Sequence, residues 1–135
     1  MSKPFIDSHV VMYLLSGDIA KANRAQQLLQ DGGIVSVQVL NDVTSVCQRK
    51  LKMPCQEIDA VIQALTAACV VVPLTLASHE KAVDISKRYQ LSIYDANIIA
   101  CALITSASKL LTQDMQDGQL IESHVIRNPF KSFMK

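Results

Sequence analysis

Aspartates stand where short apolar segments end or where helices are expected to begin. Asp7 directly follows Phe5-Ile6, and Asp114 follows Leu110-Leu111-Thr112-Gln113, so we expect both acids at the exits of strands. Asp95 lies in the first turn of a predicted helix. In an open parallel sheet, ligands bind beyond the carboxyl ends of the strands. The spacing therefore predicts a group of carboxylates at that edge of a sheet.

Asp42 is a further candidate, on a helix predicted over 38–51. At about 100° per residue, apolar side chains fill one arc of this helix. Asp42 stands at the edge of that arc, whereas Asn41 points away from it and Gln38 is a polar neighbour. An acid in the position of Asp42 can face a cleft beside the sheet.

Each acid also has an ordinary structural interpretation. Asp7 could cap a helix that starts at Ser8, Asp95 could be the third helical residue after a Ser92 cap, and Asp114 could begin a turn. Taken singly, capping is the commoner role of such residues. Taken together they indicate more, because converging carboxylates raise one another's pKa unless a cation joins them.

A site of aspartates without histidine or thiol ligands favours Mg²⁺ or Mn²⁺ over zinc. Such an ion activates water, stabilises charge on a phosphate and aligns an in-line attack. The acids therefore fit hydrolysis of a phosphodiester.

Short apolar segments alternate with helical ones along the chain. Strands are predicted at 4–6, 34–37, 69–74, 109–112 and 124–127, and helices at 8–15, 19–30, 38–51, 56–68, 78–90 and 94–106. Apolar strands separated by helices of this length indicate a parallel sheet covered on both faces. We predict an α/β fold, a three-layer α/β/α sandwich with a mostly parallel central sheet, formed by residues 1–135 as a single domain.

Composition excludes several classes of protein. The chain has 135 residues, of which 50% are hydrophobic and 19% charged, with a net charge of +1, so neither a disordered chain nor a strongly basic nucleic-acid binder is indicated. No apolar run approaches the ~20 residues of a membrane span, and no signal peptide is recognisable. We expect a cytoplasmic protein whose four cysteines stay reduced, without structural zinc.

The blocks that carry the acids resemble a PIN domain, in particular the VapC-type toxin ribonucleases of bacterial toxin–antitoxin pairs. These blocks are Phe5-Ile6-Asp7-Ser8, the segment 36–42, the segment 91–100 around Tyr94-Asp95-Ala96, and Leu111-Thr112-Gln113-Asp114-Met115. The resemblance covers nearly the whole chain, and the Tyr94-Asp95-Ala96 block is the most specific.

The resemblance implies a metal-dependent endoribonuclease with RNA as substrate. It also implies a homodimer held inactive by a small antitoxin protein whose C-terminal segment occupies the active-site groove. By position, Asp7, Asp95 and Asp114 match the family's aspartates that bind Mg²⁺ or Mn²⁺. Ser8 and Thr112 match hydroxyl residues that support the site.

Two positions depart from the family's pattern. Asp42 stands where the family usually has glutamate, and its side chain is shorter by roughly 1.5 Å, so it could reach the metal through water and activity could be weaker. His9 stands in place of the usual asparagine and could equally be a surface histidine. Asp117 is a further acid near Asp114, although Asp117-Gly118 also fits a turn.

Alternative functions stay open at this point. A PIN-like module that binds RNA but has lost useful catalysis through Asp42 would tolerate neutralised acids, whereas an enzyme would not. A response-regulator-like phosphoacceptor is disfavoured, because it needs paired acids near the N-terminus and a lysine after a strand, and Lys109 precedes its strand. The basic residues Arg49, Lys50 and Lys52 could contact phosphates or simply end a helix.

Overall fold

The computed structural model describes residues 3–105, 107, 109–112, 120–121 and 124–127, the last two ranges as backbone only. Helices and strands alternate through most of this length. Their order is β1 (Phe5–Ile6), α1 (Ser8–Met12), the 3-10 helix η1 (Tyr13–Leu15), α2 (Ile19–Asp31), β2 (Gly33–Ser36), α3 (Val37–Arg49), α4 (Cys55–Ala68), β3 (Cys69–Val72), α5 (Leu76–Tyr89), α6 (Ile93–Ile104), β4 (Leu110–Leu111), β5 (Leu120–Ile121) and β6 (His124–Arg127).

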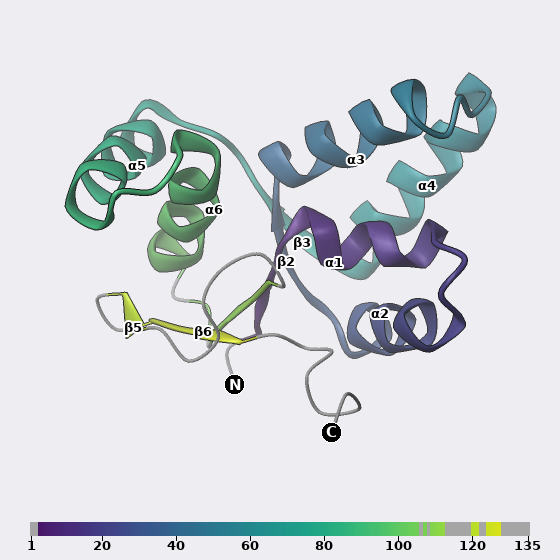
Figure 1. Cartoon of the computed structure of the whole chain (residues 1–135), viewed down its shortest axis with the longest axis horizontal. Coiled ribbons are helices and arrows are strands. Elements are labelled where there is room, and N and C mark those ends of the chain that lie inside the picture. Colours follow the sequence, from purple (N-terminus) through teal and green to yellow (C-terminus); the bar gives the residue numbers. More distant parts are fainter. Residues whose placement is uncertain (1–2, 106, 108, 113–119, 122–123, 128–135) are drawn as a thin grey trace.

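The strands form a sheet between two layers of helices. The strand order is β3-β2-β1-β4-β6-β5, with β5 antiparallel to β6 and every other neighbouring pair parallel. Helices α1, α2, α3 and α4 lie on one side of the sheet and α5 and α6 on the other (Figure 1). The predicted α/β/α sandwich with a mostly parallel sheet is confirmed.

Most predicted elements are present, and the differences have local causes. Ser36 ends β2 and caps α3 by accepting a hydrogen bond from the Val39 N–H, so Val37 is helical instead of extended. Strand β3 stops at Val72, before Pro73, which lacks the N–H that a ladder needs. Strand β5, which is two residues long, was not predicted.

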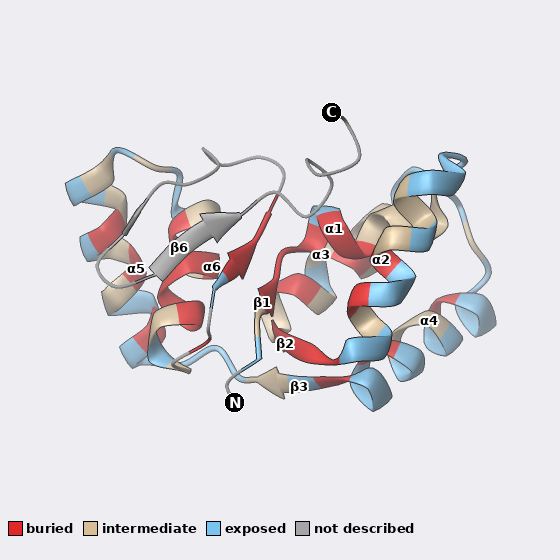
Figure 2. Ribbon diagram, turned by 90° about the horizontal axis from the view of Figure 1, so that it is seen from below, coloured by how far each residue is buried: buried red, intermediate tan, exposed pale blue. Residues whose placement is uncertain are grey.

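The core lies between the sheet and the helical faces turned towards it (Figure 2). Phe5, Ile6 and Val35 of the central strands are fully buried. On α4, Ile58 and Leu65 are buried and Val61 and Ile62 pack against the core, so the apolar stripe of this helix belongs to the interior. All four cysteines are free thiols, as predicted.

The register of two neighbouring strands places the first acid. Strands β1 and β4 are parallel, with Phe5 opposite Leu110 and Ile6 opposite Leu111. The residues that follow these two strands, Asp7 and Thr112, therefore lie side by side at the carboxyl edge of the sheet. A backbone hydrogen bond of 3.0 Å from the Asp7 N–H to the Leu111 carbonyl extends the pairing to this point.

Within the described residues, no helix has the length and apolar character that would let it cross a membrane.

Candidate active site

A pocket of about 310 Å³ opens between α1, α3 and α6, where β1 and β2 end. Three predicted acids line it: Asp7 from the end of β1, Asp42 from α3 and Asp95 from α6. The structure therefore brings together side chains separated by up to 88 positions (95 − 7) in the sequence.

Asp7 is held in place by several hydrogen bonds. Its side chain is 4% exposed, and Oδ1 accepts from the Ser8 N–H at 2.6 Å and from the Ser8 hydroxyl at 3.2 Å. The Thr112 hydroxyl donates to Oδ2 at 2.6 Å from the neighbouring strand. Asp7 is the N-cap of α1, so the capping interpretation is confirmed, and capping fixes the carboxylate at the pocket.

Asp42 is half-buried and shares a partner with Asp7. The Ser8 hydroxyl lies 3.2 Å from Asp42 Oδ2 as well as 3.2 Å from Asp7 Oδ1. The Gln38 amide donates to Asp42 Oδ1 at 2.8 Å from one turn earlier on α3. Asn41 is exposed, so the predicted orientation of this helix is confirmed.

The pKa values of these two acids move in opposite directions. Burial acts to raise the pKa of Asp7, but the His9 imidazole and hydrogen bonds from Thr112 and Ser8 outweigh it, so the pKa lies below its ordinary value. Burial also raises the pKa of Asp42, and the negative charge of Asp7 adds to this; the bonds from Gln38 and Ser8 offset it only in part. Asp7 therefore ionises at a lower pH than an ordinary aspartate and Asp42 at a higher pH.

Asp95 enters the pocket from the start of α6. Ser92 caps this helix by accepting from the Asp95 N–H at 3.1 Å, which makes Asp95 the third helical residue as predicted. This bond uses the backbone N–H of Asp95, and the half-buried residue also lines the pocket.

His9 lies beside the acids without being enclosed by them. Its Nδ1 is 3.9 Å from Asp7 Oδ2, and its side chain is 56% exposed. It is a surface histidine that also lines the pocket. The structure therefore confirms a surface histidine and places it next to Asp7.

Two of the predicted acids, Asp114 and Asp117, lie outside the described residues. Thr112 is described and fully buried against Asp7. Thr112 is the last described residue before Asp114.

The sequence analysis assigned no site role to several residues that the structure places in or beside the pocket, among them Gln38 and Tyr94. Gln38 was seen only as a polar neighbour, although its spacing of four residues from Asp42 permits the hydrogen bond that forms. Tyr94 precedes Asp95 and lines the pocket. The signal that could have identified Tyr94 is its position in the first turn of a helix, next to the predicted metal ligand Asp95.

The donors of the pocket suit a hard divalent cation. Among described side chains, no group of three or more histidine, cysteine, aspartate or glutamate residues is close enough to form a preassembled metal centre. The oxygens of Asp7 and Asp42 nevertheless converge on one hydroxyl, and their like charges raise the pKa of Asp42. Each carboxylate oxygen has two lone pairs, and the bonds from Thr112 to Asp7 Oδ2 and from Gln38 to Asp42 Oδ1 each use one of them, so both oxygens can still bind a cation.

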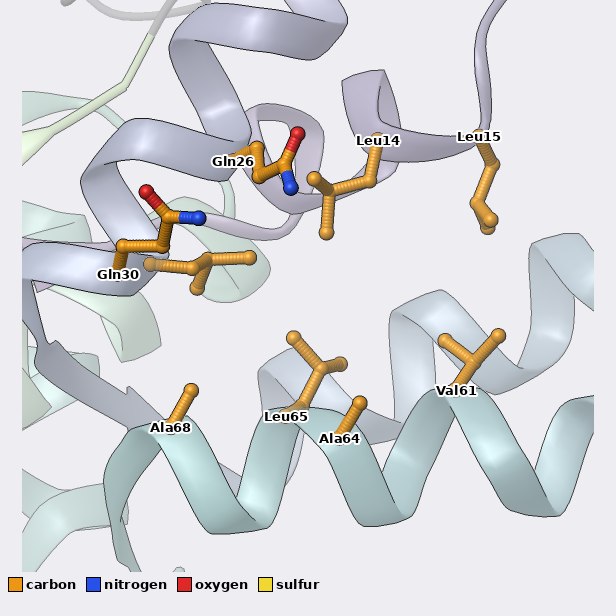
Figure 3. A pocket seen from close by; sticks show the side chains of 9 residues that line it. Leu14, Leu15, Gln26, Gln30, Val61, Ala64, Leu65 and Ala68 are labelled. Atoms are coloured by element: carbon orange, nitrogen blue, oxygen red, sulfur yellow. The ribbon is translucent and has the colours of Figure 1, made fainter.

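A second pocket, of about 290 Å³, is apolar and lies between η1, α2 and α4 (Figure 3). Leucine, valine and alanine side chains form most of its walls, with Gln26 and Gln30 as the polar members. It offers no acid, base or nucleophile, so we place the chemistry in the acidic pocket.

Comparison with models of protein families identifies one family. The sequence model of the PIN domain matches residues 5–116, a range that includes all four blocks described above. Compared with curated proteins by sequence, the chain has no significant match.

Solved structures similar to this chain include bacterial toxin proteins. A toxin–antitoxin complex from Klebsiella pneumoniae matches with a TM-score of 0.72 and 19% identity, covering 93% of this chain and 97% of that chain. VapC20 from Mycobacterium tuberculosis, described as a sarcin-ricin loop cleaving toxin, matches with a TM-score of 0.64 and 18% identity, covering 82% and 88%. VapBC2 from Rickettsia felis, bound to a promoter DNA fragment, matches with a TM-score of 0.68 and 11% identity, covering 92% and 96%. At these identities the likeness shows the fold.

Proposed function

Because this chain belongs to the PIN domain family, we propose that it is a metal-dependent endoribonuclease and the toxin of a toxin–antitoxin pair. The observation that carries the proposal is the convergence of Asp7, Asp42 and Asp95 on one pocket at the carboxyl edge of the sheet. The described likeness to toxin–antitoxin complexes supports an antitoxin protein as partner. We also propose that the protein forms a homodimer and acts in the cytoplasm.

The residues of the pocket have distinct tasks in this reaction. Asp7, Asp95 and Asp114 would hold Mg²⁺ or Mn²⁺ directly, and Asp42 directly or through water. The bound ion supplies charge stabilisation at the phosphate and a more acidic water.

The hydrogen bonds of the site position these ligands. Thr112 and Ser8 orient the Asp7 carboxylate and favour its ionised form, which is the form that binds a cation. Asp42 is held through both oxygens, because Oδ1 accepts from the Gln38 amide and Oδ2 lies within hydrogen-bond distance of the Ser8 hydroxyl. These contacts reduce the rearrangement needed when RNA and cation enter.

The test is cleavage of a structured RNA pool by purified protein in Mg²⁺, Mn²⁺ or EDTA. We expect cleavage that is lost in EDTA and in Asp95→Asn and retained in Asp59→Asn, a matched change at an exposed acid of α4. Binding without cleavage under every metal would favour the catalytically weakened RNA-binding module. Cleavage unaffected by EDTA would rule out the proposed mechanism.

Lengthening Asp42 is expected to preserve or raise activity. Asp42→Glu adds one methylene and restores the residue usual at this position of the family, so the carboxylate gains reach towards the cation. Its rate in the same assay is compared with that of wild type and of Asp42→Asn, which removes the charge. A glutamate variant that binds Mn²⁺ like wild type but cleaves more slowly would contradict the assignment.

A further inference from the structure

Tyr94 is an exposed aromatic residue at the rim of the acidic pocket. Its side chain is 69% exposed on the first turn of α6 and lines the pocket together with Asp95. The other tyrosines of the described chain differ, because Lys21 lies over the Tyr13 ring at 4.6 Å and Arg88 over the Tyr89 ring at 5.3 Å. Those two rings pair with cations of the protein, whereas Tyr94 is exposed beside the acids.

Two chemically different sets of residues line the pocket. The polar set is the three acids, Ser8, His9 and Ser45, and the apolar set is Met12, Val46 and Ile98, with Tyr94 as the aromatic member. A nucleotide combines the same two kinds of group, since its phosphate suits a cation held by carboxylates and its base is flat and largely apolar. A ligand that used only its phosphate would leave the apolar residues in contact with water.

On the basis of the proposed ribonuclease function, we propose that Tyr94 stacks on a nucleobase of the RNA next to the scissile phosphate. Stacking on an aromatic ring is available to every base, so the contact favours no particular sequence. It does require the base to be unstacked from its neighbours, which single-stranded segments and loops allow and a duplex does not. Tyr94 therefore selects unpaired RNA.

The test measures binding and cleavage separately for wild type, Tyr94→Phe, Tyr94→Ala and Leu76→Ala. The last variant is a matched control, because Leu76 is 73% exposed and lies on α5, away from the pocket. The probe is a fluorescently labelled single-stranded RNA of mixed sequence. Binding is followed by anisotropy with Ca²⁺ in place of Mn²⁺, and cleavage by steady-state kinetics with Mn²⁺.

We expect Tyr94→Ala to raise both Kd and KM by about 5- to 150-fold, the effect of losing one stacked base. Tyr94→Phe keeps the ring and should stay within about 2-fold of wild type, as should Leu76→Ala. Annealing the probe to its complement should weaken wild-type binding and remove the difference between wild type and Tyr94→Ala.

The outcomes separate this inference from the proposed function. If wild type binds and cleaves single-stranded RNA but Tyr94→Ala matches it in Kd and KM, the stacking role is wrong and the ribonuclease assignment stands. If wild type binds with the expected dependence on Tyr94 but does not cleave, the stacking role stands and catalysis is wrong. If wild type does not bind RNA, both are overturned.

Discussion

Asp7→Asn is expected to lower the rate of RNA cleavage by more than about 100-fold, since loss of even an indirect partner of a metal ligand commonly costs 10- to 100-fold. The carboxylate of Asp7 is buried and held by Ser8 and Thr112, so no other described acid can occupy its place. Asparagine retains the shape but offers a neutral oxygen and an amide that repels a cation. Single-turnover cleavage in Mn²⁺ measures the loss.

The same substitution is expected to destabilise the fold, which the sequence alone did not indicate. Relief of repulsion among carboxylates predicts a harmless change, but the pKa of Asp7 is lowered, so its ionised form stabilises the folded state. Because its hydrogen bonds lose their charged acceptor, we expect the free energy of unfolding to fall by at least about 1.5–3 kcal/mol at pH 7. Asp95→Asn leaves the bond from the Asp95 N–H to Ser92 in place and should unfold like wild type.

Urea unfolding at pH 7 checks this difference in stability. We expect folded Asp7→Asn protein to keep its cleavage defect at every Mn²⁺ concentration. Full activity of Asp7→Asn would remove Asp7 from the site.

Thr112→Val is the second large expected effect, on stability and activity together. Valine preserves the shape of the fully buried Thr112 but removes the 2.6 Å hydrogen bond to Asp7. A hydrogen bond to a charged group contributes about 1.5–3 kcal/mol, so unfolding should become easier by that amount at pH 7. Loss of this support should also weaken Mn²⁺-dependent cleavage about 10- to 100-fold.

The pH dependence of Thr112→Val identifies the cause. The pKa of Asp7 in the folded protein lies below its ordinary value of 3.8, so this acid stabilises the fold above that pH and its contribution is lost as pH falls through the folded value. The deficit of Thr112→Val should therefore be full at pH 7 and shrink below about pH 4. Thr112→Ser, which keeps the hydroxyl, should resemble wild type, and a deficit of equal size at every pH would point to packing instead.

Much of the fold and part of the site follow from local sequence patterns. The apolar run Cys69–Val72 predicted a strand, although its burial was overestimated because β3 lies at the edge of the sheet and Val70 is 58% exposed. The position of Asp42 at the edge of the apolar arc of its helix predicted that it faces the pocket. The bond between Thr112 and Asp7 depends on strand register across 105 positions, which no local pattern contains. The exposure of Tyr94 could not be predicted either, because it depends on how α6 packs against neighbouring elements.

The measurement that tests the central claim most directly is Mn²⁺ binding by isothermal titration calorimetry, which needs no knowledge of the target RNA. Wild type, Asp7→Asn, Asp95→Asn and the control Asp59→Asn are titrated at pH 7. The carboxylate pocket predicts saturable binding by wild type and Asp59→Asn, and at least about 10-fold weaker binding by Asp7→Asn and Asp95→Asn. Equal affinity in all four proteins would contradict a metal site built on these acids.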